Sequence, residues 1–342
     1  MLLDEPSWWY REAPGAAAKI LQPLGAVFGW AARARYYRSR PHRARFPVIC
    51  VGNFTAGGTG KTPLALYLCE QLKAAGHEPV ALTRGYGGRL TGPYWVNAGT
   101  DRARDVGDEA LLLARVAPTL LARNRRLGAE AIARGPHPVT VIVMDDGLQN
   151  PTLAKDLTLA VVDGRRGLGN GRVMPAGPLR ASLDMQLELT DGVVVNEPAL
   201  APGEVADWLR QRFVGPVLRA STTPACALDW LRERKVLAWA GIGAPERFFS
   251  LLRGLGADLI GHVTFPDHHR PSEAEAARLL AAARSSSAML VTTEKDAVRL
   301  RGEAGALEEL WRQSRPVPVR LQFSAQEAER LAVLVDAALR LP

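Results

Sequence analysis

Apolar residues follow two different periods along this chain, and the two periods alternate from Pro47 onward. Short, nearly continuous runs rich in Val and Ile are followed by longer stretches in which apolar residues recur every three or four positions. The runs predict buried strands, and the stretches predict helices that cover them. Repeated βα units with such strands predict an α/β protein with a mostly parallel sheet. Strands are expected in PVICVG, PVALT, TVIVMD, LTLAVVD and DGVVVNE, and helices at 63–75, VGDEALLLARVA and RRLGAEAIARG.

A second, smaller βα series follows the first. The stretch VGPVLRASTTPACALDWLRERK is typical of connecting strands, and KVLAWAGIGAPERFFSLLRGLG then begins the new unit. At 342 residues, the chain is long enough for two domains that each bury a core. We therefore predict an N-terminal helix with a basic flank at 1–45, a larger α/β domain at 46–215, linker strands at 216–235, a smaller α/β domain at 236–325 and a C-terminal helix at 326–342.

The N-terminal region combines an apolar helix with a cluster of positive charge. Ile20–Ala32 is apolar apart from Gln22, and six arginines without an acidic residue follow between Arg33 and Arg45. Thirteen residues with an internal proline are too few to span a bilayer. Together with the tryptophans at 8 and 9, the pattern predicts an amphipathic helix lying on a membrane surface. The alternatives are a helix packed on the protein's own core and a surface that binds nucleic acid.

Composition supports a globular protein with an anionic partner. Hydrophobic residues make up 47% and charged residues 23%, and the formal net charge is +8. No nucleic-acid-binding motif accompanies the arginines, so we expect no nucleic-acid partner, and no protein partner is evident. The three cysteines, Cys50, Cys69 and Cys226, are odd in number and far apart. They indicate reduced thiols and a cytoplasmic location.

The segment TAGGTGKT, from Thr55 to Thr62, lies between a predicted strand and a predicted helix. Its three glycines allow backbone N–H groups to turn inward on phosphate oxygens. Lys61 is placed to reach the terminal phosphates, and the hydroxyl of Thr62 is placed to bind Mg²⁺. A glycine-rich turn without a ligand is the alternative, but the flanking strand and helix favour a nucleoside triphosphate site.

Three further groups of residues carry candidate chemistry. Asp145 and Asp146 end an apolar strand, where an aspartate of a P-loop enzyme holds Mg²⁺; a solvated turn is the alternative. Asp108 and Glu109 begin a helix, either as caps of free N–H groups or as a general base and a magnesium ligand. The turn FPDHH in the smaller unit is either a surface loop or the source of a histidine that partners an aspartate across a cleft.

The order of the motifs resembles that of a known enzyme family. VGNFTAGGTGKTP, TRGYGG, GDE, DDGLQ, GNGRVMPAGPLR, AGIGAPERFF, FPDHH and TTEKDAV occur in this order along nearly the whole chain. This combination is similar to the tetraacyldisaccharide 4′-kinases of lipid A biosynthesis. The resemblance implies a larger P-loop NTPase-like domain with a mostly parallel sheet, a second, smaller α/β domain and a cleft between them. Asn150 and Ala110 stand where the family often has His and Pro.

The resemblance also implies roles for matching positions. The phosphates of ATP would be bound by Thr55, Ala56, Gly57, Gly58, Thr59, Gly60, Lys61 and Thr62. Asp108 would be the catalytic base, paired with His268, while Lys61 holds the transferred group. Mg²⁺ would be served by Thr62, Glu109, Asp145 and Asp146. Tyr86, Arg172 and Arg180 would lie near the substrate.

The implied reaction is transfer of the γ-phosphoryl group of ATP to the 4′-hydroxyl of a tetraacyldisaccharide 1-phosphate, giving lipid IVA. The implied place is the cytoplasmic face of the inner membrane of a Gram-negative-type bacterium, where the protein would be peripheral. A rival interpretation is a P-loop ATPase or GTPase switch, which the phosphate loop and basic flank alone would fit. The switch does not account for the FPDHH turn contributed by a second domain. An Asn-Lys-x-Asp motif, typical of GTPases, is not evident.

Overall fold

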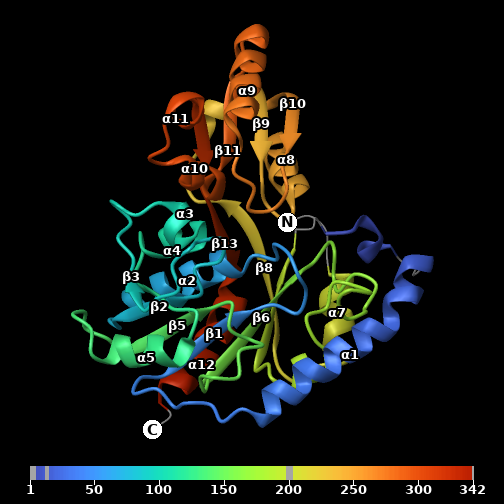
Figure 1. Cartoon of the computed structure of the whole chain (residues 1–342), viewed down its shortest axis with the longest axis vertical. Helices are drawn as coiled ribbons and strands as arrows, with labels where there is room; N and C mark the ends of the chain where they lie inside the picture. The colour runs from blue at the N-terminus through green and yellow to red at the C-terminus, as the bar shows by residue number, and fades with distance from the viewer. Residues whose placement is uncertain (1–4, 12–14, 198–202, 341–342) are drawn as a thin grey trace.

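Two sheets organise the chain into a larger and a smaller lobe (Figure 1). The structure is a computed structural model that describes residues 5–11, 15–197 and 203–340. The larger lobe has the strand order β13-β8-β7-β6-β1-β5-β2-β4-β3, and the smaller lobe has the order β10-β9-β11-β12. The predicted N-terminal segment, larger domain and C-terminal helix also include residues 1–4, 12–14, 198–202 and 341–342, which lie outside the described residues.

The nine-stranded sheet of the larger lobe is parallel except at its edges. β3 pairs antiparallel with β4, β13 pairs antiparallel with β8, and the pairs between these edges are parallel. The strands are β1 (Val48–Gly52), β2 (Pro79–Thr83), β3 (Tyr94–Trp95), β4 (Thr119–Leu121), β5 (Val141–Asp145), β6 (Leu157–Asp163), β7 (Gly192–Asn196), β8 (Val217–Pro224) and β13 (Val319–Phe323). This confirms the predicted α/β class with a mostly parallel sheet.

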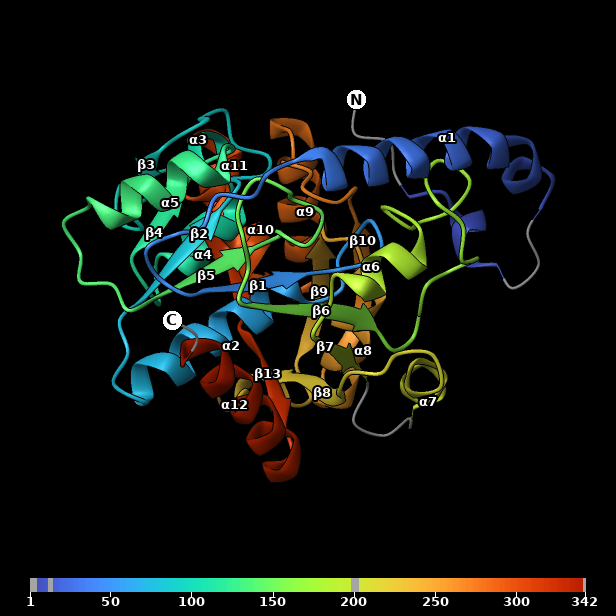
Figure 2. The same cartoon turned by 90° about the horizontal axis from the view of Figure 1, so that it is seen from below.

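Helices cover both faces of this sheet, as Figure 2 shows for α5 on one side and α2 and α12 on the other. Ile49 and Val51 of β1 pack in the core with α2 and α12, while Val48 packs in the core with α5. The alternation of side chains along a strand produces this division. The helices are α2 (Lys61–Ala74), α3 (Ala103–Val106), α4 (Asp108–Leu113), α5 (Arg125–Ala133), α6 (Leu183–Glu188), α7 (Glu204–Arg210) and α12 (Ala325–Leu339).

The smaller lobe is a four-stranded parallel sheet with its own core around Trp239 and Phe249. Its strands are β9 (Lys235–Ala240), β10 (Asp258–Thr264), β11 (Met289–Thr293) and β12 (Ser314–Val317). Its helices are α8 (Pro245–Gly254), α9 (Glu273–Ser286), α10 (Glu294–Leu300) and α11 (Gly305–Gln313), and a short 3-10 helix at Asp229–Leu231 precedes it. The chain then returns, because β13 and α12 belong to the sheet and core of the larger lobe.

The N-terminal helix α1 (Ala16–Arg38) lies along the larger lobe (Figure 1) after a 3-10 turn at Ser7–Tyr10. Its buried residues are small: Ala18, Gly25 and Gly29. A Cβ on Gly25 would lie 2.7 Å from the carbonyl oxygen of Val173, so the helix approaches the lobe through its glycines. Its large apolar side chains are exposed instead: Ile20, Leu24, Val27, Phe28 and Trp30. Within the described residues, no helix is long and apolar enough to cross a membrane.

The structure places one tryptophan differently from the sequence-based expectation, and it agrees with the expectation for the cysteines. Trp9, expected at a lipid interface, is buried, and its indole N–H donates to the carbonyl oxygen of Pro175 over 3.1 Å. An indole is mostly apolar surface with one donor, so a protein pocket that supplies an acceptor holds it as well as a membrane does. Cys50, Cys69 and Cys226 are free thiols, as expected, and the first two are buried.

Candidate functional site

A cavity of about 2150 Å³ lies between the lobes and contains most of the predicted site. It is lined by the glycine loop after β1 and by the loops that follow β5, β6 and β7. From the smaller lobe, residues 242–245 and 264–268 and the start of α10 face the same space. Ligands of parallel α/β sheets bind outside the carboxyl ends of the strands, and this cavity has that position.

The glycine loop joins β1 to α2 as predicted, and Ala56–Thr62 line the cavity. Gly57 and Gly60 have positive φ angles of 87° and 106°, which side-chain-bearing residues rarely adopt. A Cβ on Gly60 would lie 2.7 Å from Nδ2 of Asn196, so this position has neither the conformation nor the space for a side chain. The carbonyl oxygen of Thr55 accepts the Nε–H of Arg180 over 3.1 Å. Thr55 itself, unlike the rest of the loop, is not among the described residues that line the cavity.

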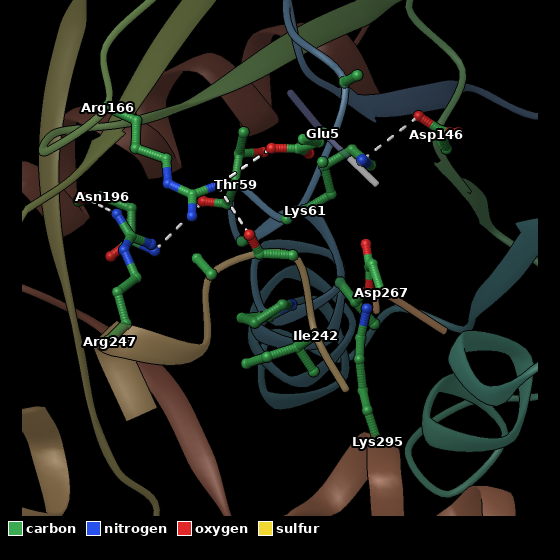
Figure 3. A pocket seen from close by; sticks show the side chains of 18 of the residues that line it. Glu5, Thr59, Lys61, Asp146, Arg166, Asn196, Ile242, Arg247, Asp267 and Lys295 are labelled. Atoms are coloured by element: carbon green, nitrogen blue, oxygen red, sulfur yellow. Dashed lines mark hydrogen bonds and ion pairs between the residues drawn. The ribbon is translucent and has the colours of Figure 1, made fainter. Parts of the chain in front are cut away.

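Lys61 is held at the start of α2 by the second aspartate of the DDG turn. Its Nζ lies 3.7 Å from Oδ1 of Asp146 (Figure 3). Nη1 of Arg180 donates to the same oxygen over 2.6 Å. Burial opposes ionisation of Asp146, but the charges of Arg180 and Lys61 outweigh it and hold the pKa of Asp146 well below its usual range. The structure thus brings Lys61, Asp146 and Arg180 together beside the phosphate loop.

Asp145, the first aspartate of the DDG turn, differs from Asp146 in its surroundings. It is fully buried at the end of β5, and neither of its carboxylate oxygens has a hydrogen-bond partner. Burial, with the charges of Glu109 and Asp146, raises the pKa of Asp145 to about 7. Among the residues that the structure describes, no three His, Cys, Asp or Glu side chains form a ready-made metal cluster. Mg²⁺ is usually held by one or two carboxylates together with substrate phosphates, so the unpartnered carboxylate of Asp145 fits this ion. Asp145 is not among the described residues that line the cavity, whereas Thr62 lines it.

Asp108 and His268 meet across the contact between the lobes. Nδ1 of His268 lies 3.2 Å from Oδ2 of Asp108, and Oδ1 of Asp108 accepts the backbone N–H of Glu109 over 2.9 Å. Asp108 is 3% exposed and is not among the described residues that line the cavity, whereas His268 lines it. Only His268 of this pair therefore presents an atom to the cavity.

The electrostatics of the pair follow from burial and from charged neighbours. Burial raises the pKa of Asp108, but the charge of Arg299 and the hydrogen bond from His268 outweigh it and hold this pKa well below its usual range. Burial lowers the pKa of His268, but the hydrogen bond to Asp108 and the charge of Asp108 raise it above its usual value. Asp108 thus remains ionised and stabilises a proton on His268.

Glu109 lines the cavity beside the pair and forms an ion pair with a lysine of the smaller lobe. Nζ of Lys295 donates to Oε1 of Glu109 over 2.7 Å. Lys295 comes from the first turn of α10 in the smaller lobe and also lines the cavity (Figure 3). Burial lowers the pKa of Lys295, yet the charges of Glu109 and Asp108 raise it above its usual range.

The three predicted substrate residues are placed differently. The ring of Tyr86 contacts the ring of His268 edge to face at 4.8 Å, and both line the cavity. Arg180 lines the cavity beside Asp146, as described above. Arg172 instead donates to Oε1 of Gln22 on α1 and is not among the described lining residues. The structure therefore brings Tyr86 and Arg180 to the site but not Arg172.

The two departures from the family pattern have local consequences. The side-chain oxygen of Asn150 accepts the backbone N–H of Thr152 over 3.0 Å and its hydroxyl over 2.8 Å. Asn150 thus stabilises its own turn while it lines the cavity. Ala110 is buried in the first turn of α4.

Sequence reasoning missed a carboxylate that lies against the phosphate loop. A Cβ on Gly57 would lie 1.7 Å from Oε1 of Glu5, so the loop admits this carboxylate only because residue 57 is glycine. Oε2 of Glu5 accepts the hydroxyl of Tyr10 over 2.8 Å and Nη1 of Arg166 over 3.2 Å (Figure 3). Burial raises the pKa of Glu5. The LDEPS surroundings of Glu5 and the RRG surroundings of Arg166 give no sequence signal for such a contact.

Sequence reasoning also missed the residues that join the phosphate loop to its surroundings. Nδ2 of Asn196 donates to the carbonyl oxygen of Thr59 over 3.3 Å. Arg247 of the smaller lobe donates to the carbonyl oxygen of Asn196 over 2.9 Å and pairs with Asp163. The asparagine in the run DGVVVNE, which is the last residue of β7, was a signal, because polar residues at the carboxyl ends of parallel strands face the ligand site.

Comparisons with known proteins show which family this chain matches. Residues 17–339 match the family described as tetraacyldisaccharide-1-P 4′-kinase (LpxK). A tetraacyldisaccharide 4′-kinase of Parvibaculum lavamentivorans is 50% identical over 301 residues, with 87% of each chain covered. One of Nitrobacter winogradskyi is 46% identical over 341 residues, with 99% of each chain covered.

A solved structure also has this fold. The crystal structure of LpxK from Aquifex aeolicus in complex with ATP matches with a TM-score of 0.72 and 24% identity, and the match covers 94% of this chain and 99% of that one. The family match, the identities to the two relatives and the coverage lead to one conclusion. The chain belongs to the tetraacyldisaccharide-1-P 4′-kinase family.

Proposed function

We propose which role each residue of the cavity has when this chain phosphorylates the 4′-hydroxyl of a tetraacyldisaccharide 1-phosphate. The chain is a kinase of lipid A biosynthesis. One observation carries the proposal. A single cavity contains the phosphate loop with Lys61, the imidazole of His268 and the side chains of Phe28 and Arg35 from α1. It thus links a nucleotide site, a proton acceptor and a surface suited to lipid.

ATP is the proposed phosphate donor, as the solved relative's complex suggests. The backbone N–H groups of Ala56–Thr62 and the positive end of α2 bind its phosphates. Lys61 contacts the transferred group, and Arg180 keeps Asp146 oriented beside it. Asp145 and Thr62 would hold Mg²⁺, which would neutralise charge that builds up on the phosphate oxygens. Most of the catalysis is then alignment and electrostatic stabilisation.

The Asp108–His268 pair acts as one unit that accepts the hydroxyl proton of the sugar. Asp108 carries the negative charge that makes the pair basic. Nδ1 of His268 is turned toward Asp108, while Nε2 lies 3.8 Å from Oδ1 of Asp267, which also lines the cavity. A buried carboxylate that orients a histidine and stabilises its protonated form is a recurring arrangement in enzymes. The family resemblance implies that Asp108 is the base. The pH profile described below distinguishes this role from proton acceptance by Nε2 of His268.

The lipid acceptor is proposed to reach this cavity from a membrane surface through α1. The exposed side chains Ile20, Leu24, Val27, Phe28 and Trp30 form an apolar surface that the lobe leaves uncovered. Arginines 33, 35, 38, 40, 43 and 45 follow it, and anionic headgroups attract such a segment. Since Phe28 and Arg35 also line the cavity, acyl chains can stay in the bilayer while the sugar enters.

The direct test is phosphoryl transfer with purified protein. Radiolabelled ATP and tetraacyldisaccharide 1-phosphate are incubated with the protein in mixed micelles, and the lipid product is separated by thin-layer chromatography. We expect a labelled bisphosphorylated lipid, and ATP consumption that depends on the acceptor. ATP hydrolysis at the same rate without the acceptor would instead indicate a nucleotide-dependent switch. The Lys61→Ala variant, which keeps the loop glycines, serves as the inactive control.

A further inference from the structure

One other side chain of the smaller lobe makes more contacts with Asp108 than the side chain of His268 makes. Arg299, in the last turn of α10, is almost fully buried. Its Nε donates to Oδ2 of Asp108 over 2.8 Å, and its Nη2 donates to the same oxygen. Oδ2 therefore receives two N–H groups of Arg299 and faces Nδ1 of His268. An arginine that donates twice to one carboxylate fixes the direction of that carboxylate.

Arg299 also holds the backbone that carries His268. Its Nη1 donates to the carbonyl oxygen of Gly241 over 2.6 Å, and this oxygen also accepts the backbone N–H of His268 over 3.1 Å. Arg299, Gly241, His268 and Asp108 thus form a closed ring of contacts. His268 has a φ angle of 59°, which a non-glycine residue keeps only where its surroundings hold it. The ring supplies that hold.

Asp296 fixes the guanidinium from its other side. Oδ1 of Asp296 accepts Nη1 of Arg299 over 2.6 Å and the backbone N–H of Gly241 over 3.0 Å. Asp296 lies one turn before Arg299 on α10 and is fully buried. Arg299 therefore has one orientation, defined by its own helix, and transmits it to Asp108 in the other lobe.

We propose that Arg299 is a positioning residue that sets the geometry of the Asp108–His268 pair. The proposal rests on the function proposed above. Arg299 is not among the described residues that line the cavity, so it acts through the pair and not on either substrate. Since α10 belongs to the smaller lobe and Asp108 to the larger, the pair acquires its geometry when the lobes are in contact.

A simpler role for Arg299 is that of a tie between the lobes, and Arg301 separates the two roles. Arg301 follows α10 directly, and its guanidinium donates to the carbonyl oxygens of Ala98 and Gly99 in the larger lobe. It joins the same two lobes from the same helix end, and its hydrogen bonds within the described residues go to neither Asp108 nor His268. An effect of lobe contact alone would appear in variants of both arginines.

The experiment compares Arg299→Gln, Arg299→Lys and Arg301→Gln with the unaltered protein. Each is assayed for kcat, for KM of ATP and of the lipid acceptor, and for thermal unfolding. We expect Arg299→Gln to lower kcat by about 100-fold with little change in either KM, because misplacement of a catalytic group acts on the transition state. Arg299→Lys should recover part of kcat, since an ammonium group can still donate to Asp108. Arg301→Gln should keep kcat.

A double variant shows whether Arg299 acts through the pair. Groups that work as a unit give non-additive losses, so Arg299→Gln in a His268→Ala background should cost little further activity. Three outcomes would overturn the proposal. In the first, the losses of activity from Arg299→Gln and His268→Ala multiply in the double variant. In the others, Arg299→Gln and Arg301→Gln lose equal activity, or Arg299→Gln keeps its kcat. If Arg299→Gln does not fold, the same comparison is made with Arg299→Lys. Failure of the proposed function is distinguishable, because the unaltered protein itself would then make no lipid product.

Discussion

Nδ1 of His268 lies 3.2 Å from Oδ2 of Asp108, although the two residues belong to different lobes and stand 160 positions apart in the chain. Neither lobe contains the pair alone. In the proposed mechanism, chemistry therefore depends on contact between the lobes, which is a common way to keep a phosphoryl donor from water until the acceptor has bound. The pH dependence of turnover is the first consequence.

The acid limb of kcat should lie above the usual pKa of histidine, about 6.5. Asp108 raises the pKa of His268 because it favours the protonated ring. A ring that must accept a proton is inactive when already protonated, so kcat falls as the pH drops through this raised pKa. Kcat is measured with saturating substrates from pH 5 to 9. If Asp108 accepts the proton directly, its lowered pKa predicts a kcat that stays flat over this range.

Replacement of Asp108 by asparagine should remove most turnover and leave ATP binding nearly unchanged. The amide keeps the shape but loses the charge that stabilises a proton on His268, and a loss in kcat of about 10³- to 10⁴-fold is expected from comparable arrangements. Breaking its buried pair with Arg299 should also lower the free energy of unfolding by about 3 kcal/mol or more. Calorimetric titration with ATP is the control, and an equal loss of ATP affinity would indicate a structural or metal-binding role for Asp108.

Gly60→Ala should abolish ATP binding. The position has a φ angle of 106°, and a Cβ there would lie 2.7 Å from Nδ2 of Asn196. Gly76→Ala is the matched control, because Gly76 also has positive φ, at 85°, but a Cβ on it meets nothing within 4 Å. We expect the control to lose about 1 kcal/mol of stability and no ATP affinity. Similar ATP binding by the two variants would show that the loop tolerates side chains.

Glu5→Gln should bind ATP more tightly. The carboxylate of Glu5 lies against Gly57 and pairs with Arg166, where its charge opposes incoming phosphates. Loss of that charge frees Arg166 for the nucleotide, and we expect the Kd of ATP to fall by about tenfold, or 1.4 kcal/mol. Titration at several salt concentrations checks this, since an electrostatic gain shrinks as salt rises. Weaker binding would mean that Glu5 assists the nucleotide.

Polar replacements on the exposed face of α1 should release the protein from membranes. Changing Ile20, Leu24, Val27 and Trp30 to Ser removes large apolar side chains that the lobe does not cover. At about 1.5 kcal/mol or more for each buried side chain, binding to anionic vesicles should fall at least tenfold in a sedimentation assay. Val333→Ser is the control, because Val333 is 63% exposed on α12. Unchanged sedimentation of the α1 variant would exclude this face as the anchor.

Local patterns carried much of the fold. The runs around Val48–Gly52 and Val141–Asp145 became buried parallel strands, and the glycine loop lies between a strand and a helix as predicted. Such features depend on neighbours along the chain, where apolar period and turn chemistry act. The pairing of Asp108 with His268 came from the family resemblance, because sequence spacing does not show which loops of two lobes meet.

The arginines show where sequence reasoning ends. Arg172 and Arg180 lie in one motif and have the same chemistry, yet only Arg180 reaches the cavity, while Arg172 binds Gln22 on α1. Arg299 lies beyond the last recognised motif, and its importance depends on a helix from one lobe docking on another. A guanidinium serves equally well at a surface or in a buried fork, so its role is decided by packing between distant segments.

The contact between Gly58 and Gly243 has a consequence for inhibitors. A Cβ on Gly243 would lie 2.5 Å from the backbone nitrogen of Gly58, so bare main chain of one lobe rests on the phosphate loop of the other. A side chain at residue 243 would therefore not fit at this contact. A molecule inserted at this seam would lie against the phosphate loop, because both glycines line the cavity, so it would hold the two lobes apart and also obstruct the nucleotide phosphates.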